Sequence, residues 1–264
     1  MPRTPIGAHQ TELKSRKILG MRVDATSYDD AVRRITRWAR AGKSRYVCIA
    51  AVNNVMQAHD DPPFMSVMNS ADLVTPDGMP LVWGLRRLGV AEASRVYGPD
   101  LTPAILSAAE EQGIPVGFFG GAGEVLPTLL EVVKGRWPAL EVSYSHSPPF
   151  RAPTPAEEDA IVDEIDSSGA RILLVGLGCP KQEYWMARHK GRLQCVSVGV
   201  GAAFDFIAGT KKQAPPVMQR SGTEWLYRLL SEPKRLWKRY LLHNPRFMAL
   251  FGVQLVRRGR VGTT

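Results

Sequence analysis

The sequence predicts an α/β protein with a Rossmann-like, mainly parallel sheet, helices on both faces of that sheet, and a basic helical appendage at the C-terminus. Short apolar runs alternate with amphipathic stretches over most of the 264 residues, which is the pattern of β-α units that feed a parallel sheet. Glycines follow several of these runs, as is common where a strand turns into a helix. The alternation stops after Gly209, where basic and apolar residues become interleaved.

The elements follow from the apolar runs and the amphipathic stretches between them. Strands are expected over residues 18–23, 46–52, 72–75, 116–119, 140–144, 172–175 and 195–200. Helices are expected over 28–41, opening at a Ser27 cap, and over 101–112, 124–136, 155–167 and 182–190. We divide the chain into a flexible arm (1–16), a Rossmann-like domain (17–213) and an appendage (214–264), whose helical pieces should break at Pro233 and Pro245.

The charge of the chain is concentrated in its last segment. The formal net charge is +9, and residues 220–264 supply ten Lys and Arg against only two Glu. A nearly neutral body with a basic, apolar tail suggests action on an anionic ligand at a membrane surface. No nucleic-acid-binding motif accompanies the tail, so we expect no nucleic-acid partner. No apolar run approaches the roughly 20 residues that span a bilayer, and the N-terminus lacks the apolar core of a signal peptide, which predicts a cytoplasmic protein.

Residues that could hold a metal ion do not have the required spacing. The three cysteines form no C-x-x-C, the five histidines form no H-x-x-x-H, and no strand ends in D-x-D. Cys48 and Cys195 lie in predicted strands, and Cys179 is interpreted as a small packing residue. We therefore expect no metal site and no cofactor.

Ligands of open parallel sheets gather beyond the carboxyl ends of the strands. Four such junctions carry glycine or acidic residues: 76–78, 120–123, 176–183 and 199–205. Glycine lets backbone N–H groups approach a phosphate, and the N-terminus of the following helix adds partial positive charge. These turns predict a nucleotide pocket that includes Gly120, Gly121, Gly178 and Gly201. For residues 120–123 the alternative is that glycine serves only the steric needs of a strand-to-helix turn.

Two other features have alternative interpretations. Asp77, between a strand and Gly78, either caps the next helix or removes a proton from an attacking sugar hydroxyl. The basic tail is either a solvated helix face or a binding surface. An apolar stripe lies beside its arginines, comprising Trp225, Leu226, Tyr227, Leu229, Leu230, Leu236, Trp237, Tyr240, Leu241 and Leu242. A solvated face needs no such stripe, so it should cover the body, a partner or lipid.

Five ordered motifs, over residues 71–78, 95–101, 176–183, 199–206 and 224–235, closely resemble those of the WecG/TagA/CpsF glycosyltransferases. The resemblance extends from about Ile18 to Arg246. It implies a bacterial inverting transferase that moves a hexose, N-acetylmannosamine or its uronic acid in the best-known members, from UDP to a polyprenyl-diphosphate-linked saccharide of the cell surface. Some members transfer glucose or another hexose, and this alternative stays open.

The resemblance also implies roles for individual residues. Asp77 matches the proposed base, Arg95 and Gln182 match contacts to the sugar nucleotide, and Arg228 and Arg235 match catalytic arginines that close the site over the diphosphate. Many members carry Thr-x-Asn at the end of the second strand, where this chain has Ala51. The expected substrate-binding set is Asn53, Arg95, Asp100, Gly120, Gly121, Gly178, Gln182, Gly201, Asp205, Lys238 and Arg239.

The expected partners are a UDP-sugar donor, a polyprenyl-diphosphate-linked acceptor, an anionic membrane surface on the inner face of the plasma membrane, and a second copy of the chain that would hide the apolar stripe. Two rival functions remain from the residues alone. One is a dinucleotide-dependent oxidoreductase that uses residues 120–123 and places Glu141 on a ribose. The other is a non-enzymatic module that binds polyanions through the tail.

Overall fold

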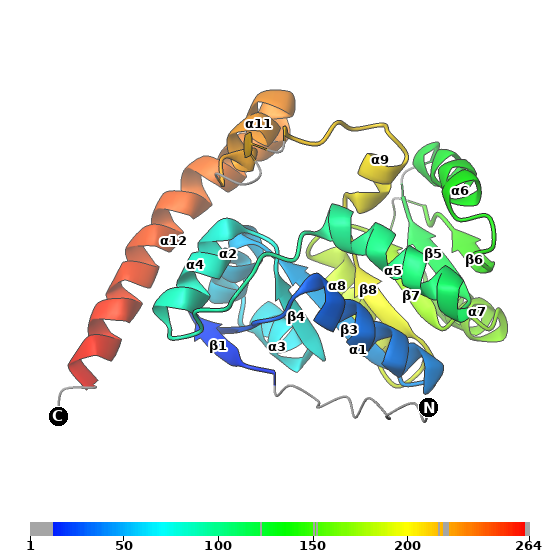
Figure 1. Ribbon diagram of the computed structural model, residues 1–264, viewed down its shortest axis with the longest axis horizontal. Coiled ribbons are helices and arrows are strands. Elements are labelled where there is room, and N and C mark those ends of the chain that lie inside the picture. Colours follow the sequence, from blue (N-terminus) through cyan, green and yellow to red (C-terminus); the bar gives the residue numbers. More distant parts are fainter. Residues whose placement is uncertain are drawn as a thin grey trace, which may run out of the picture.

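A six-stranded parallel sheet forms the centre of the molecule in the computed structural model (Figure 1). The structure describes residues 13–121, 123–149, 151, 153–215, 217–218 and 222–261, without the side chains of residues 235, 238, 239 and 259–261. The strand order is β4-β3-β8-β7-β5-β6. The strands are β3 (Arg45–Ala50), β4 (Leu73–Pro76), β5 (Val116–Gly120), β6 (Val142–His146), β7 (Ile172–Gly176) and β8 (Val196–Gly199). The predicted Rossmann-like fold is confirmed.

Helices cover both faces of the sheet, and each face has its own apolar cluster. One face is covered by α2 (Val52–Asp60), α3 (Pro62–Ser70), α4 (Met79–Arg87), α7 (Pro155–Ser167) and α8 (Lys181–His189). The other is covered by α1 (Tyr28–Arg40), α5 (Gly98–Gln112), α6 (Val125–Arg136) and α9 (Ala203–Ile207). The central strands are therefore buried on both sides, which is why their sequences read as continuous apolar runs.

This arrangement opens crevices at one edge of the sheet. After β8 the chain turns to α9 on one face, whereas the neighbouring strands β3 and β7 lead to α2 and α8 on the other face. Likewise β5 leads to α6 while its neighbour β7 leads to α8. Connections that diverge in this way leave ligand-sized space beyond the carboxyl ends of the strands.

The N-terminal strand prediction was wrong in detail. Instead of one strand over 18–23, the chain forms an antiparallel hairpin of β1 (Ser15–Ile18) and β2 (Met21–Asp24), so Ser15 and Arg16 belong to a strand rather than to a flexible arm. The turn places Leu19 and Gly20 at positive φ, and the apolar pattern runs through it without a strong turn signal. Buried Asp24 accepts hydrogen bonds from the Ser15 hydroxyl and from the backbone N–H of Val74, which fixes the hairpin beside β4.

Several boundaries also differ from the predictions. Helices α2, α3, α4 and α9 were not expected, α5 begins three residues earlier than predicted, and β6 lies two residues further along the chain. The predicted break at Pro233 is confirmed, since α11 (Glu224–Ser231) ends just before α12 (Pro233–Val261). The break at Pro245 was wrong because α12 continues through it. Proline costs one helical hydrogen bond there, and burial of Phe247 and Phe251 on the following turns offsets that cost.

The C-terminal helix packs along the body rather than standing free (Figure 1). Leu236, Phe247 and Phe251 are buried, and the latter two join the apolar cluster that also contains α2 and α4. The Arg246 guanidinium binds the Asp60 carboxylate through two hydrogen bonds of 2.5 and 2.6 Å. Within the described residues, no helix combines the length and the apolar character needed to cross a membrane.

Candidate active site

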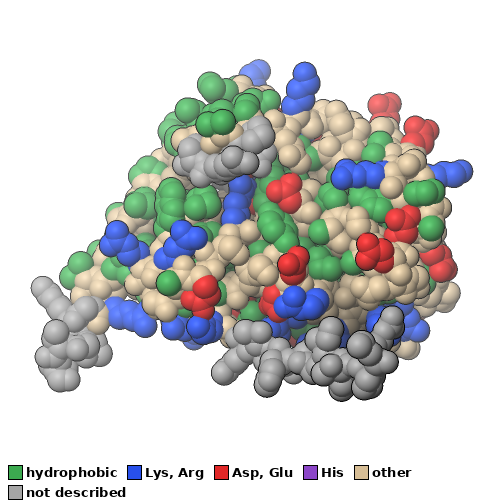
Figure 2. All heavy atoms as spheres, viewed as in Figure 1, with side chains coloured by type: hydrophobic (Ala, Val, Ile, Leu, Met, Phe, Trp, Pro, Cys, Tyr) green, Lys and Arg blue, Asp and Glu red, His purple; other side chains and the backbone are tan. Residues whose placement is uncertain are grey.

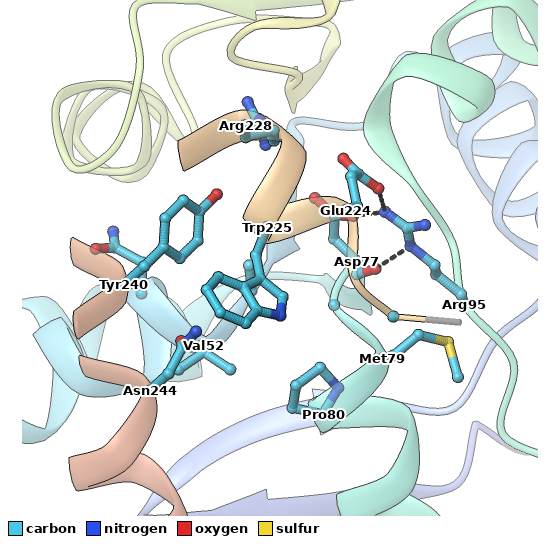
Figure 3. Close-up of a pocket in the computed structure, with 14 residues that line it drawn as sticks. Val52, Asp77, Met79, Pro80, Arg95, Glu224, Trp225, Arg228, Tyr240 and Asn244 are labelled. Atoms are coloured by element: carbon cyan, nitrogen blue, oxygen red, sulfur yellow. Dashed lines mark hydrogen bonds and ion pairs between the residues drawn. The ribbon is translucent and has the colours of Figure 1, made fainter. Parts of the chain in front are cut away.

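Two adjoining pockets lie at the carboxyl edge of the sheet. The first, called here the edge pocket, is formed by the ends of β3, β7 and β8 and includes Tyr97, Gly178, Gln182, Gly201 and Phe206. The second, called the tail pocket, is closed by α11 and α12 and is lined by Val52, Asn53, Met79, Pro80, Trp225, Tyr240 and Asn244 (Figure 3). Ala51, Asp77 and Arg228 line both pockets. A group held at Asp77 can therefore act between ligands in the two pockets.

Asp77 directly follows β4, and its backbone N–H donates to the Ala50 carbonyl at 2.8 Å, which fixes its position at the strand end. Its side chain is 21 % exposed. Burial raises the pKa of this carboxyl, and Glu224 raises it further, while Arg95 and Arg228 lower it; the net pKa lies above its ordinary value. A carboxylate that binds protons more readily than usual is suited to general-base chemistry.

Arg95 connects Asp77 to the C-terminal segment. Its Nη2 lies 3.2 Å from Asp77 Oδ1 and 2.6 Å from Glu224 Oε2, and its Nε donates to the Asp77 carbonyl (Figure 3). The guanidinium also stacks over the Tyr97 ring at 4.2 Å. Burial lowers the pKa of Arg95, but the two carboxylates raise it above its ordinary value, so this side chain stays charged. Arg95 is thus fixed from three sides.

Arg228 brings a positive charge from α11 to the junction of the two pockets. Its guanidinium carbon lies 5.7 Å from the centre of the Phe206 ring. Burial lowers the pKa of Arg228, but Tyr240, Tyr97, Asp77 and Glu224 raise it above its ordinary value. Among the described residues, no carboxylate forms an ion pair with Arg228, so its charge is available to an anionic ligand.

The predicted contacts Gly178, Gln182 and Gly201 all line the edge pocket. Buried Gln182 accepts a hydrogen bond from the Gly178 N–H at 3.2 Å and donates to Glu183 Oε1 at 3.1 Å. Gly178 and Gly201 have φ of 78° and 53°. Asn53, predicted to lie near the sugar, lines the tail pocket, where its amide contacts Cys179 Sγ at 3.8 Å. The turns after β7 and β8 are thus held around one cavity.

Gly120 and Gly121 lie in a separate cavity beyond the ends of β5 and β7, called here the β5 cavity. Its walls are formed by Phe119, Pro148, Pro149, Pro153, Ile161, Leu177, Pro180, Tyr184 and Trp185, with Arg151, Glu158, Lys181 and Arg188 among its polar residues. A Cβ on Gly120 would lie 2.6 Å from the backbone of Gly176, so only glycine fits between these two strands. Because Gly120 and Gly121 line the β5 cavity and not the edge pocket, they do not share a pocket with Asp77.

The structure does not bring every predicted residue to the two pockets. Asp100 is exposed on the first turn of α5, where it accepts a hydrogen bond from the Tyr28 hydroxyl at 3.3 Å. Asp205 pairs with Lys211 at 3.3 Å. Neither aspartate lines the edge pocket or the tail pocket. The backbones of Arg235, Lys238 and Arg239 belong to α12, but the predictions for their side chains lie outside the described part of the structure.

Several residues that line the two pockets were not predicted, among them Tyr97, Glu224 and Trp225. Tyr97 and Trp225 lie within the motifs at 95–101 and 224–235, but an aromatic side chain is equally expected in the core or, for Trp225, in the apolar stripe of the tail. Glu224 did carry a signal, because it is one of only two acidic residues in the basic tail and directly precedes the aromatic stripe. A lone carboxylate among arginines indicates a specific partner.

A switch-point crevice with a carboxylate, two guanidinium groups and two pockets suits an enzyme that transfers a group between two substrates. Residues 16–261 match the family model described as "Glycosyl transferase WecG/TagA/CpsF family", and the chain belongs to this family. It is therefore a glycosyltransferase, which decides against the oxidoreductase and the non-enzymatic module. The chain is also similar to the N-acetylglucosaminyldiphosphoundecaprenol N-acetyl-beta-D-mannosaminyltransferase of Bacillus spizizenii strain W23, with 31% identity over 208 residues and 78% of each chain covered.

Proposed function

We propose that this protein is an inverting transferase that moves an N-acetylmannosamine-type hexose from a UDP-sugar to a polyprenyl-diphosphate-linked saccharide during bacterial cell-surface polysaccharide synthesis. The activity named for the Bacillus relative supports both the sugar and the class of acceptor. The observation that carries the proposal is the position of Asp77 between two pockets, with Arg228 beside it. One pocket can hold a donor and the other an acceptor, with a base where they meet.

The donor fits the edge pocket best. Arg228 supplies a charge for its diphosphate, and the glycine turns around Gly178 and Gly201 expose backbone to it. The cavity volume of about 200 Å³ is below the range of about 300–1,000 Å³ that is usual for small-molecule sites. We therefore place the nucleoside end of the donor toward the β5 cavity, whose lining residues Leu177 and Pro180 flank Gly178 and Cys179 of the edge pocket in the chain. There it would lie near the aromatic rings of Tyr184 and Trp185.

The acceptor fits the tail pocket. Its walls combine apolar groups of Met79, Pro80 and Trp225 with the polar Asn53 and Asn244 (Figure 3). An aromatic ring with nearby amides suits a saccharide, which presents both C–H faces and hydroxyl groups. The pocket is closed by α11 and α12, whose exposed apolar side chains continue outward from it. The lipid chain of the acceptor would follow that surface.

In the proposed step, a hydroxyl of the acceptor saccharide attacks the anomeric carbon of the donor hexose. Asp77 accepts the hydroxyl proton as the new C–O bond forms. The bond to UDP breaks on the opposite side of the carbon, UDP leaves with the electron pair, and the single displacement inverts the configuration. Arg228 stabilises the developing charge of the diphosphate, and the resemblance assigns similar work to Arg235 with Lys238 or Arg239.

A transfer assay tests this function. The purified protein should be incubated with UDP-N-acetylmannosamine, UDP-N-acetylglucosamine, UDP-glucose and UDP-N-acetylmannosaminuronic acid, each with a short-chain lipid diphosphate N-acetylglucosamine as acceptor. We expect a disaccharide product from one donor, with the anomeric configuration of that donor inverted. Retention of configuration, or no product from any donor with this acceptor, would contradict the proposal.

A further inference from the structure

We propose that Glu224 is a positioning residue that ties the docking of α11 to the state of Asp77 through Arg95. This inference rests on the proposed role of Asp77 as the base. Glu224 belongs to the first turn of α11, in the same helix as Arg228, yet its carboxylate is turned inward and only 8 % of the residue is exposed. An almost fully buried carboxylate in a basic, surface-lying segment needs a specific partner.

That partner is shared with the base. Nη2 of Arg95 binds Glu224 at 2.6 Å and Asp77 at 3.2 Å, so one nitrogen serves both carboxylates (Figure 3). The shorter contact is made to Glu224. When α11 is docked, Glu224 therefore draws the guanidinium toward the C-terminal segment and adds a second negative charge beside Asp77. Both effects make Asp77 a stronger base than Arg95 alone would leave it.

The other charged and titratable groups around Asp77 come from several elements. Arg228 of α11 lowers the pKa of Asp77, whereas burial, the largest cause, and Glu224 raise it. Tyr97, which caps α5, and Tyr28 of α1 also lie within electrostatic range of Asp77. Burial raises the pKa of Tyr28 to about 12 and places that of Tyr97 well above its ordinary value, so both stay neutral near pH 7. Asp100 of α5 is a further carboxylate within electrostatic range of Arg95 and Glu224. Glu224 is the carboxylate that raises the pKa of Asp77, and it belongs to α11.

As a consequence, the pKa of Asp77 is raised by Glu224 only when the C-terminal segment is docked. Docking of α11 brings Arg228 to the diphosphate and Glu224 to Arg95 in one movement, because both side chains stand on the same helix. A site that binds donor without the docked segment would have a weaker base and no Arg228. Wasteful hydrolysis of the donor by water would then be disfavoured until the segment closes.

The test compares E224Q with wild type and with E232Q. The glutamine keeps the shape of Glu224 and a hydrogen bond to Arg95 but removes the charge. Glu232 is a matched control, since it belongs to the same segment and pairs with Lys211 at 3.5 Å rather than with Arg95. We expect the acidic limb of the pH profile of kcat/KM to move down by roughly half a pH unit or more in E224Q, with a several-fold lower plateau, and to stay unchanged in E232Q.

A second variant, E224A, tests the docking itself. We expect faster tryptic cleavage after Lys211 and Lys212 than in wild type, slowed again by UDP. An E224Q profile that matches wild type in its acidic limb would overturn the inference, as would wild-type cleavage rates in E224A. The D77N variant separates the two ideas: activity in D77N refutes Asp77 as the base, whereas an inactive D77N with an unshifted E224Q profile refutes only the role of Glu224.

Discussion

Asp77 can act as a base only when it is ionised, and its surroundings oppose that ionisation. Burial raises the pKa of Asp77, with Arg95 and Arg228 opposing the shift and Glu224 adding to it. An ordinary aspartate has a pKa of about 3.9. The protonated and therefore inactive form should persist to higher pH in this enzyme than that value suggests.

The pH dependence of kcat/KM should reveal this shift, because it reports ionisation in the free enzyme. We predict an acidic limb centred clearly above pH ~4, with activity rising as Asp77 loses its proton. Steady-state rates across the acidic and neutral range at constant ionic strength would measure it. A limb at the position of an ordinary aspartate would mean that Asp77 is not the base or is not buried when the enzyme acts.

At the residue scale, the residues that could be predicted from the sequence are those that combine a charged or polar side chain with a place in a recognisable motif. Asp77, Arg95, Gln182 and Arg228 all reach the two pockets, although they come from distant parts of the chain. The place of Glu224 in the basic tail indicates that it has a specific partner but not which one, since its contact with Arg95 spans 129 positions of sequence. Asp100 and Asp205 share motifs with site residues, but Asp100 accepts a hydrogen bond from Tyr28 and Asp205 pairs with Lys211 instead. A motif predicts where the backbone passes and not where each side chain points.

The strand-end turns set the geometry of the site at the scale of single elements. Gly176 ends β7, and a Cβ at this position would lie 2.5 Å from Phe204, whose ring is buried between the turns of β5 and β8 and packs on Phe118 at 5.8 Å. A ring so enclosed cannot move aside. The glycine is therefore required by packing as well as by any ligand.

We predict that G176A destabilises the protein by about 1–3 kcal/mol, the usual cost of overpacking a core. Thermal unfolding would show a melting temperature several degrees below wild type. G135A is the matched control: its Cβ would meet no atom within 4 Å, it lies inside α6, and alanine favours helix there, so its melting temperature should not fall. Equal stability of G176A and wild type would contradict the packing derived for this turn.

Helices and strands with a clear periodicity of apolar residues were predicted well. Elements that depend on tertiary packing were not. The capped helices α1 and α7 follow the pattern of their sequence, with Ser27 and Thr154 accepting the capping hydrogen bonds. Helices α2, α3 and α4 were missed because they are short and are stabilised by burial on the sheet, and α3 and α4 carry prolines in their first turns. The same burial carries α12 through Pro245. Intrinsic helix propensity is overridden where tertiary packing contributes more to the stability of an element.

On the scale of the whole molecule, exposed apolar side chains gather on one side of the surface (Figure 2). Apolar side chains remain exposed along α11 and α12, namely Trp225, Leu226, Leu230, Trp237, Leu241, Leu242, Met248, Val253 and Val256. Basic residues lie in the same segment, which fits the association with the inner face of the plasma membrane that the sequence predicts. The tail pocket lies against this surface, so a lipid-linked acceptor could reach it from the bilayer.

Vesicle sedimentation would test this surface. We predict binding to phosphatidylglycerol vesicles that weakens at high salt, since each basic residue near an anionic surface contributes about 1 kcal/mol. The double variant L241Q/L242Q should bind several-fold more weakly. V142Q is the control, because Val142 is exposed on β6, at the opposite end of the molecule from α12 (Figure 1). Equal binding of all three proteins, or none by wild type, would contradict the membrane proposal.

The central claim is that Asp77 removes the acceptor proton. The D77N variant should stay folded. Because the pKa of Asp77 is raised in the native state, the protonated carboxyl stabilises the fold at low pH, and that stabilisation is lost as the pH rises through the raised pKa. Asparagine is neutral at every pH, so D77N does not lose stability in this way at pH 7.

Turnover of D77N, measured beside its affinity for UDP, is therefore the most direct test. We predict that kcat falls on the order of a hundredfold or more while UDP affinity stays near that of wild type. Sugar transfer by D77N at the wild-type rate would contradict the account.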